Sequence, residues 1–437
     1  MVSLGCSKNQ VDAERILATL RREGFELSGD VLLCDVVIVN TCGFIEDAKK
    51  ESIGHILEFG ARKDQGGLKA LVVTGCLAER YRDELADEMP EVDVVLGIGK
   101  NADIASAIRA ALGGERVVEF GEKSHLSLEG ERVLFDSPHT AYLKIADGCG
   151  NRCSYCAIPI IRGDFRSRRI EDVLSEANSL AESGVTELNL IAQDTTRYGE
   201  DIYGELMLPK LLEKLCEIDS IHWIRVLYCY PQRVTDKLLK TMAKNAKIVP
   251  YIDLPIQHVS KRVLSEMGRQ GDSTWLRKLI VDIRKNIPEV AIRTTLITGF
   301  PGETEEEFAE LCEFVRDMRF ERLGCFVFSP EEGTPAALMK NQIDDEVKRR
   351  RADIIMELQM DIALENGNAM IGKTIQILCE GFDKKEGMWF GRSSADAPDV
   401  DTKVYFYAEN EVVPGDYITV KITEGYGYDI LGIKLEV

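Results

Sequence analysis

Hydrophobic residues in the first quarter of the chain fall into short runs, and longer segments with helical spacing separate these runs. The runs are rich in valine and isoleucine and do not alternate with polar residues, which is typical of strands that are buried on both faces of a parallel sheet. They lie at residues 1–5, 35–40, 69–75 and 92–99. Because helical segments such as 11–25 connect them, we predict a parallel sheet with crossover helices.

A second alternation of strands and helices follows from about residue 140 to about residue 330. Helical segments, such as 170–184 and 303–318, separate six apolar runs. The six runs lie at 141–146, 186–193, 223–229, 249–256, 290–299 and 322–329. Six strands are fewer than the eight of a closed barrel, so we predict a partial (β/α)6 barrel.

The last part of the chain has a different pattern. Residues 343–370 predict one long helix, and short strands with glycines between them follow it to the end. That spacing of turns predicts a small all-β barrel. The predicted fold is therefore α/β, with an N-terminal parallel-sheet domain at 1–115, a connector at 116–138, the partial barrel at 139–368 and the β-barrel at 369–437.

Composition places the chain among ordinary globular proteins. It has 437 residues, of which 45% are hydrophobic and 29% charged. No apolar run approaches the roughly 18 residues that span a membrane, and the N-terminus does not resemble a signal peptide. We therefore expect a cytoplasmic protein without a membrane partner. In a long chain of this class, twelve cysteines indicate metal binding or catalysis rather than disulfides.

The formal net charge is −20, with an isoelectric point near 4.9. Nucleic acids are bound largely through lysine and arginine contacts to phosphates, so this charge is a poor match for them. It suits a basic partner better, because complementary fields steer encounter. An acidic surface that only maintains solubility explains the charge equally well.

The most specific motif is a C-x-x-x-C-x-x-C sequence formed by Cys149, Cys153 and Cys156. It follows the predicted strand 141–146. Three thiolates on one tight loop suit an iron–sulfur cluster, whereas a structural zinc site takes four ligands. In a four-iron cluster, three cysteines leave one iron open for a substrate or cofactor. The alternative is three free cysteines without a ligand.

Three more cysteines, Cys6, Cys42 and Cys76, each follow a predicted strand of the N-terminal sheet. Parallel strands end at the same edge of a sheet, where ligands bind, so we expect these residues to converge. Small neighbours such as Gly5 and Gly75 would let the backbone approach a bulky group. The pattern predicts a second cluster with three ligands. The alternative is that buried cysteines are common at strand ends.

The central motif, DGCGNRCSYCAIP, resembles that of the radical S-adenosylmethionine (radical SAM) superfamily. The resemblance implies that SAM binds the open iron and that the reduced cluster cleaves it to a 5′-deoxyadenosyl radical, which abstracts hydrogen from a C–H bond. It also implies SAM contacts from Tyr155, Gln193, Asp194 and Gly299. For Gln193 and Asp194, a turn with a helix cap is an equal alternative.

The segments LGCSKN, NTCGFI and TGCLAERY, followed by the central motif, resemble the methylthiotransferase family. Its members have an N-terminal domain with an auxiliary cluster, a radical SAM barrel and a C-terminal β-barrel called TRAM. The resemblance implies two 4Fe-4S clusters, SAM, and an electron donor such as flavodoxin or ferredoxin. The implied ligands are Cys6, Cys42 and Cys76 for the auxiliary cluster and Cys149, Cys153 and Cys156 for the radical SAM cluster. We assign no catalytic residue beyond these ligands.

Members of this family methylthiolate either adenosines of tRNA or an aspartate of the twelfth protein of the small ribosomal subunit. The segments VSLGCSKNQVDAERIL and GRSSADAPDVDTKVYF resemble the ribosomal-protein branch. From residue 371 the chain has seven basic and twelve acidic residues, which suits a basic ribosomal protein better than RNA. We therefore expect modification of the aspartate β-carbon and no direct tRNA binding.

Two alternatives remain for the function. The first is the same reaction on tRNA adenosine, which the basic clusters at 162–169 and 348–351 favour. The second is an iron–sulfur protein that binds ribosomes without catalysis. Cleavage of SAM by the reduced protein would distinguish an enzyme from such a binding protein.

Overall fold

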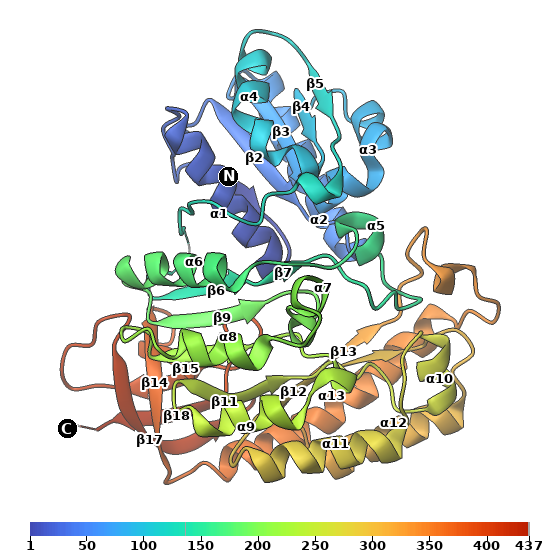
Figure 1. Ribbon diagram of the computed structural model, residues 1–437, viewed down its shortest axis with the longest axis vertical. Coiled ribbons are helices and arrows are strands. Elements are labelled where there is room, and N and C mark those ends of the chain that lie inside the picture. The colour runs from blue at the N-terminus through green and yellow to red at the C-terminus, as the bar shows by residue number, and fades with distance from the viewer. Residues whose placement is uncertain (136, 436–437) are drawn as a thin grey trace.

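The structure is a computed structural model that describes residues 1–135 and 137–435. Its N-terminal sheet has five parallel strands in the order β1-β2-β3-β4-β5 (Figure 1). The strands are β1 (Val2–Ser3), β2 (Val36–Thr41), β3 (Ala70–Gly75), β4 (Val94–Leu96) and β5 (Val117–Glu119). The predicted parallel sheet is therefore confirmed.

Helices cover both faces of this sheet, which explains why its strands are continuous apolar runs. On one face, α2 (Glu46–Asp64) and α3 (Cys76–Glu88) pack against Val37 and its neighbours. On the other face, α1 (Ser7–Arg22) and α4 (Ile104–Leu112) pack against Ile38. Successive side chains of β2 thus pack into the hydrophobic clusters on opposite faces of the sheet.

The sheet continues beyond the predicted domain boundary at residue 115. Val94 of β4 pairs with Val117, so β5 adds an edge strand from residues that were predicted as a connector. The apolar pair Val117 and Val118 is too short to be distinguished from a loop by periodicity alone. A short 3₁₀-helix at Lys123–His125 follows.

The second sheet has six parallel strands in chain order, with β6 and β13 at its two edges. The strands are β6 (Thr140–Lys144), β9 (Glu187–Ile191), β10 (Trp223–Val226), β11 (Ile248–Asp253), β12 (Ala291–Thr298) and β13 (Arg322–Val327). The main helices are α6 (Ile170–Glu182), α8 (Leu208–Leu215), α9 (Asp236–Lys244), α11 (Ser273–Asn286), α12 (Glu305–Met318) and α13 (Asp345–Asn368). This arrangement confirms the predicted partial barrel and the long helix.

The C-terminal strands form a closed barrel beside the second sheet (Figure 1). They are β14 (Thr374–Asp383), β15 (Met388–Ser393), β16 (Val404–Tyr407), β17 (Tyr417–Tyr426) and β18 (Asp429–Lys434). This confirms the predicted small β-barrel. Of the acidic residues counted in this part of the chain, Glu436 lies outside the described residues. No helix in the described ranges is long and apolar enough to cross a membrane.

The segment between β15 and β16 carries acidic residues into the partial barrel. The Tyr142 hydroxyl donates to Asp399 at 2.7 Å, and the Tyr251 hydroxyl donates to Asp401 at 2.6 Å. Asp396 pairs with Arg322 of β13. The acidic segment resembling the ribosomal-protein branch therefore joins the two barrels.

A buried ion cluster fixes the same contact between the barrels. Glu187 of β9 accepts from Arg392 at 2.6 Å and from Arg225 at 3.2 Å. All three side chains are almost completely buried. Burial alone would raise the pKa of Glu187, but the charges of Arg392 and Arg225 lower it to about 2.

We expect Glu187→Gln to destabilise the protein by about 3–5 kcal/mol, because it leaves two buried arginines without their shared carboxylate. The contribution of Glu187 is fully present above its ordinary pKa of 4.5 and is lost as the pH falls towards 2. Chemical denaturation between pH 3 and 7 measures both effects. Glu217→Gln, in an exposed pair with Lys214, is the control and should change stability by about 0.5 kcal/mol at most. Equal effects of the two substitutions would contradict the prediction.

Candidate active site

The structure brings Cys6, Cys42 and Cys76 to one edge of the N-terminal sheet. Thr41 of β2 pairs with Gly75 of β3, so Cys42 and Cys76 leave the sheet side by side. Strand β1 pairs with the other side of β2, and Cys6 follows it as the N-cap residue of α1. All three are free thiols.

Polar side chains hold these strand ends in place. The Asn9 side-chain amide donates to the carbonyl of Leu4 at 2.8 Å and to that of Thr41 at 3.2 Å. The Ser52 hydroxyl accepts from the Cys42 backbone N–H at 3.0 Å and donates to its carbonyl at 2.9 Å. The backbone on both sides of the thiols is therefore fixed by buried hydrogen bonds.

Two glycines allow close packing of the backbone beside the thiols. Gly5 has φ +86°, and a Cβ atom there would lie 2.8 Å from Cys42 Sγ. Gly75 has φ +96°, and its Cβ would lie 2.5 Å from the Thr41 carbonyl oxygen. Only glycine fits such positions without strain. The donor set of three free thiols fits a four-iron cluster.

The second set, Cys149, Cys153 and Cys156, lies on the loop that follows β7 (Ala146–Asp147). Burial raises the pKa of Cys149, and it raises that of Cys156 to about 12. Thiols of this kind stay protonated until a metal displaces the proton. Three free thiols on one loop fit the same kind of cluster.

Within the described ranges, no three cysteine, histidine or carboxylate side chains converge closely enough to bind a single metal ion. A four-iron cluster is larger, because each thiolate binds a different iron atom. Its ligands therefore surround a volume instead of converging on one point.

A short helix, α5 (Ile158–Arg162), connects the two cysteine sets. It begins two residues after Cys156, and both Ala157 and Ile161 pack against Cys76. Arg162, at its end, donates to Cys76 Sγ at 3.4 Å. In the sequence, Arg162 was noted only as part of a basic cluster. Its contact with Cys76 depends on how α3 packs against α5, which the sequence does not show.

Three of the four predicted SAM contacts lie beside the second set. The Gln193 side chain donates to Asp147 at 2.9 Å, and Asp194 accepts from Asn151 at 2.9 Å. The Tyr155 ring packs in an apolar cluster, and its hydroxyl accepts from Arg269 at 3.5 Å. The same Arg269 nitrogen lies 3.8 Å from Cys153 Sγ.

Gly299, the fourth predicted SAM contact, lies at the end of β12 under the long helix α13. Its N–H donates to Glu303 at 2.8 Å, and a Cβ there would overlap the Lys348 side chain at 2.2 Å. Close packing with α13 thus explains the glycine at this position. Its role toward SAM stays a prediction.

A cavity of 330 Å³ lies where the three domains meet, and Cys6 is part of its wall. The partial barrel contributes Tyr228, Asp253 and Arg293, and the segment after β15 contributes Asp399. Tyr228 and Asp399 have left-handed backbones, with φ of +60° and +66°. Such non-glycine conformations are concentrated at functional sites.

Buried polar atoms without hydrogen bonds mark the interior of the partial barrel. Asp253 is 2% exposed, its Oδ1 has no hydrogen-bond partner among the described residues, and the nearest cation, Arg293, is 3.7 Å away. Burial raises the pKa of Asp253, although Arg293 opposes the shift. Both side-chain amide atoms of Asn189 also lack partners within the described ranges. Asn189 of β9 lies opposite the cavity residue Tyr142 in the register of the sheet.

Three stretches of the chain match known families. Residues 1–97 match the uncharacterized protein family UPF0004, residues 143–315 the radical SAM superfamily and residues 371–433 the TRAM domain. The chain is 48% identical to the ribosomal protein uS12 methylthiotransferase RimO of Lachnoclostridium phytofermentans, over 99% of this chain and 98% of that protein. It is 46% identical to the protein of the same name from Thermoanaerobacter sp., with the same coverage.

Among solved structures, the fold is similar to that of TsrM from Kitasatospora setae, a radical SAM methyltransferase. The TM-score is 0.59 at 15% identity, over 76% of this chain and 73% of that chain. This likeness concerns the fold alone.

We expect Gly75→Ala to destabilise the protein by about 3–5 kcal/mol, because its Cβ would overlap buried backbone next to Cys76. Gly66→Ala is the matched control: Gly66 also has a positive φ, +76°, but open space surrounds it. That substitution should cost only the left-handed backbone penalty of about 1–2 kcal/mol. Urea denaturation of both variants measures the difference, and equal costs would show that the strand end tolerates a side chain.

Proposed function

The chain belongs to the RimO family of ribosomal protein uS12 methylthiotransferases, and from this we propose that it adds a methylthio group to an aspartate β-carbon of that ribosomal protein. The observation that supports this chemistry most directly is the contact of Cys76, from one three-cysteine set, with the segment that directly follows the other set. This segment includes α5, and Cys6, from the same set as Cys76, lines the cavity between the domains.

Membership in this family and in the radical SAM superfamily implies two 4Fe-4S clusters and SAM. We assign the auxiliary cluster to Cys6, Cys42 and Cys76, and the radical SAM cluster to Cys149, Cys153 and Cys156. When bound, these groups supply the radical that removes hydrogen from the target carbon, the sulfur that replaces it and the methyl group. The chain itself then has to hold, orient and shield these groups.

Residues around the second cysteine set are suited to orient SAM. Gln193 and Asp194 lie at the carboxyl end of β9, where barrel enzymes bind their ligands. Each is hydrogen-bonded to a residue near Cys149: Gln193 to Asp147, and Asp194 to Asn151. Gln193 Oε1 has no hydrogen-bond partner among the described residues, so it can accept from an amino group.

We place the target aspartate of the ribosomal protein in the cavity between the three domains. Its wall combines the proposed auxiliary ligand Cys6 with interior residues of the barrel. The unpaired oxygen of Asp253 can accept from a peptide N–H of the bound segment, and Arg293 can balance an additional carboxylate.

The relatives named for uS12 favour this substrate over tRNA adenosine. The acidic C-terminal barrel is consistent with a basic ribosomal protein, and we do not expect it to bind tRNA directly. A ribosomal substrate also implies a reaction in the cytoplasm. We retain a flavodoxin or ferredoxin as the proposed electron donor.

The decisive experiment is anaerobic incubation of the reconstituted protein with dithionite, SAM and either uS12 or tRNA. We expect 5′-deoxyadenosine to form, and we expect mass spectrometry to find a methylthio mass gain on an aspartate of uS12. A mass gain on tRNA alone would replace the proposed substrate. Absence of 5′-deoxyadenosine in every reaction would leave a binding protein as the remaining function.

Val400→Arg tests the position of the substrate. Val400 lines the cavity and is 52% exposed, so a longer, charged side chain should block entry without disturbing the cysteine sets. We expect methylthiolation of uS12 to fall at least tenfold, while SAM cleavage without substrate continues at its normal rate.

Val413→Arg is the matched control, because Val413 is 55% exposed in the same β-barrel and lies outside the set of described residues that line the cavity. It should leave methylthiolation unchanged. Equal activity of the two variants would place the substrate elsewhere.

A further inference from the structure

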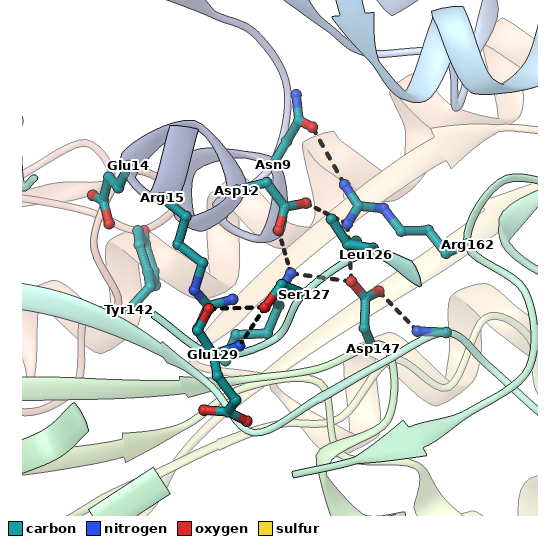
Figure 2. Close-up of polar contacts among 12 residues, drawn as sticks. Asn9, Asp12, Glu14, Arg15, Leu126, Ser127, Glu129, Tyr142, Asp147 and Arg162 are labelled. Atoms are coloured by element: carbon teal, nitrogen blue, oxygen red, sulfur yellow. Dashed lines mark hydrogen bonds and ion pairs between the residues drawn. The ribbon is translucent and has the colours of Figure 1, made fainter. Parts of the chain in front are cut away.

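Arg162 occupies a buried position between the two proposed cluster sites. Its side chain is 2% exposed and extends from the end of α5 towards α1, as Figure 2 shows. The Nη1 atom donates to Asp12 at 2.5 Å and to Asp147 at 3.0 Å. The Nη2 atom donates to Asn9 at 3.3 Å and to Cys76 Sγ at 3.4 Å.

The surrounding network is electrically balanced without the thiol. Lys144 also contacts Asp12, and it lies 3.0 Å from Asp147, so two cations share two carboxylates. All four side chains are at most 2% exposed. The carboxylates orient one edge of the planar guanidinium, and its geometry then directs the other edge at the sulfur.

We propose that Arg162 is a positioning residue that raises the reduction potential of the auxiliary cluster by donating a hydrogen bond to the Cys76 sulfur. This inference depends on the proposed function, because it takes Cys76 as a cluster ligand. Hydrogen bonds to cluster sulfurs and a nearby positive charge both favour the reduced state, which carries more negative charge. Burial strengthens both effects, since water screens the charge poorly there.

The position of Arg162 also depends on the radical SAM loop. Asp147, its partner, accepts from the Gly148 N–H at 2.8 Å, immediately before Cys149. At its other end, the loop continues into α5, which carries Arg162. Arg162 and its partner Asp147 therefore lie at the two ends of the segment that carries Cys149, Cys153 and Cys156.

The test uses full-length protein in which Cys149, Cys153 and Cys156 are replaced by alanine, so that only the auxiliary cluster is reconstituted. Iron content and the midpoint potential are then measured, the latter by redox titration with electron paramagnetic resonance detection. We expect Arg162→Gln to shift the midpoint potential to more negative values. Arg162→Lys keeps the positive charge but loses the planar guanidinium that directs an N–H at Cys76, so we expect a smaller shift in the same direction.

Arg168→Lys is the matched control for a change at a buried arginine. Arg168 is also nearly inaccessible, and its partners among the described residues are Glu129, Glu176 and backbone oxygens, none of them a sulfur. It should leave the potential of the auxiliary cluster unchanged. A shift as large as that of Arg162→Gln would show that any change in this region has the same effect and would overturn the proposal.

Removal of Arg162 leaves the two carboxylates Asp12 and Asp147 with one cation, Lys144. Arg162→Gln is therefore also combined with Asp12→Asn, which leaves one buried cation with one carboxylate. Normal iron content with an unshifted potential in these variants would overturn the inference and leave the proposed function intact. Loss of iron in all Arg162 variants would overturn it as well, by showing a role in cluster assembly. Absence of iron in the parent protein with only Cys6, Cys42 and Cys76 would instead contradict the proposed function.

Discussion

The arrangement of this protein depends on a buried charge cluster between the N-terminal domain and the partial barrel. Asp12 of α1 pairs with Lys144 and Arg162, which belong to the barrel domain. Burying charges is costly, and such clusters are weak contributors to net stability. Their effect is on orientation, because a shifted domain would leave charges buried and unpaired. The contact of Cys76 with α5, the helix that follows the second cysteine set, lies beside this cluster.

A second group of charged contacts holds the C-terminal barrel against the partial barrel. Together with the first charge cluster, these contacts position the three domains around a shared cavity. Glu187 joins Arg225 of the sheet to Arg392 of the β-barrel. The segment after β15 then reaches Tyr142 and Tyr251 inside the partial barrel. Neither barrel forms this cavity alone, and the N-terminal domain completes the wall with residues such as Cys6.

The sequence was sufficient to predict the features that are local in the chain. Apart from β5, the strands of both sheets, the long helix and the small barrel were predicted because hydrophobic periodicity reports burial directly. Convergence of Cys6, Cys42 and Cys76 followed from the rule that parallel strands end at one edge. The contact of Arg162 with Cys76 could not be predicted, because it depends on the packing of two helices from different domains. Strand β5 was too short for a clear pattern, and the cavity residue Asp253 had no distinctive neighbours in the sequence.

The segment between β15 and β16 has a consequence for how this architecture can diversify. Asp396 and Asp401 attach the C-terminal barrel to the sheet, whereas Asp399 and Val400, between them, line the cavity. Attachment and the cavity wall thus share one short stretch, far in sequence from every cysteine of the two sets. In evolutionary terms, a new target could arise through changes in these few positions while the residues for cofactors stay fixed. If the C-terminal barrel were replaced by another, the new barrel would supply both the residues that line the cavity and the residues that attach it to the sheet.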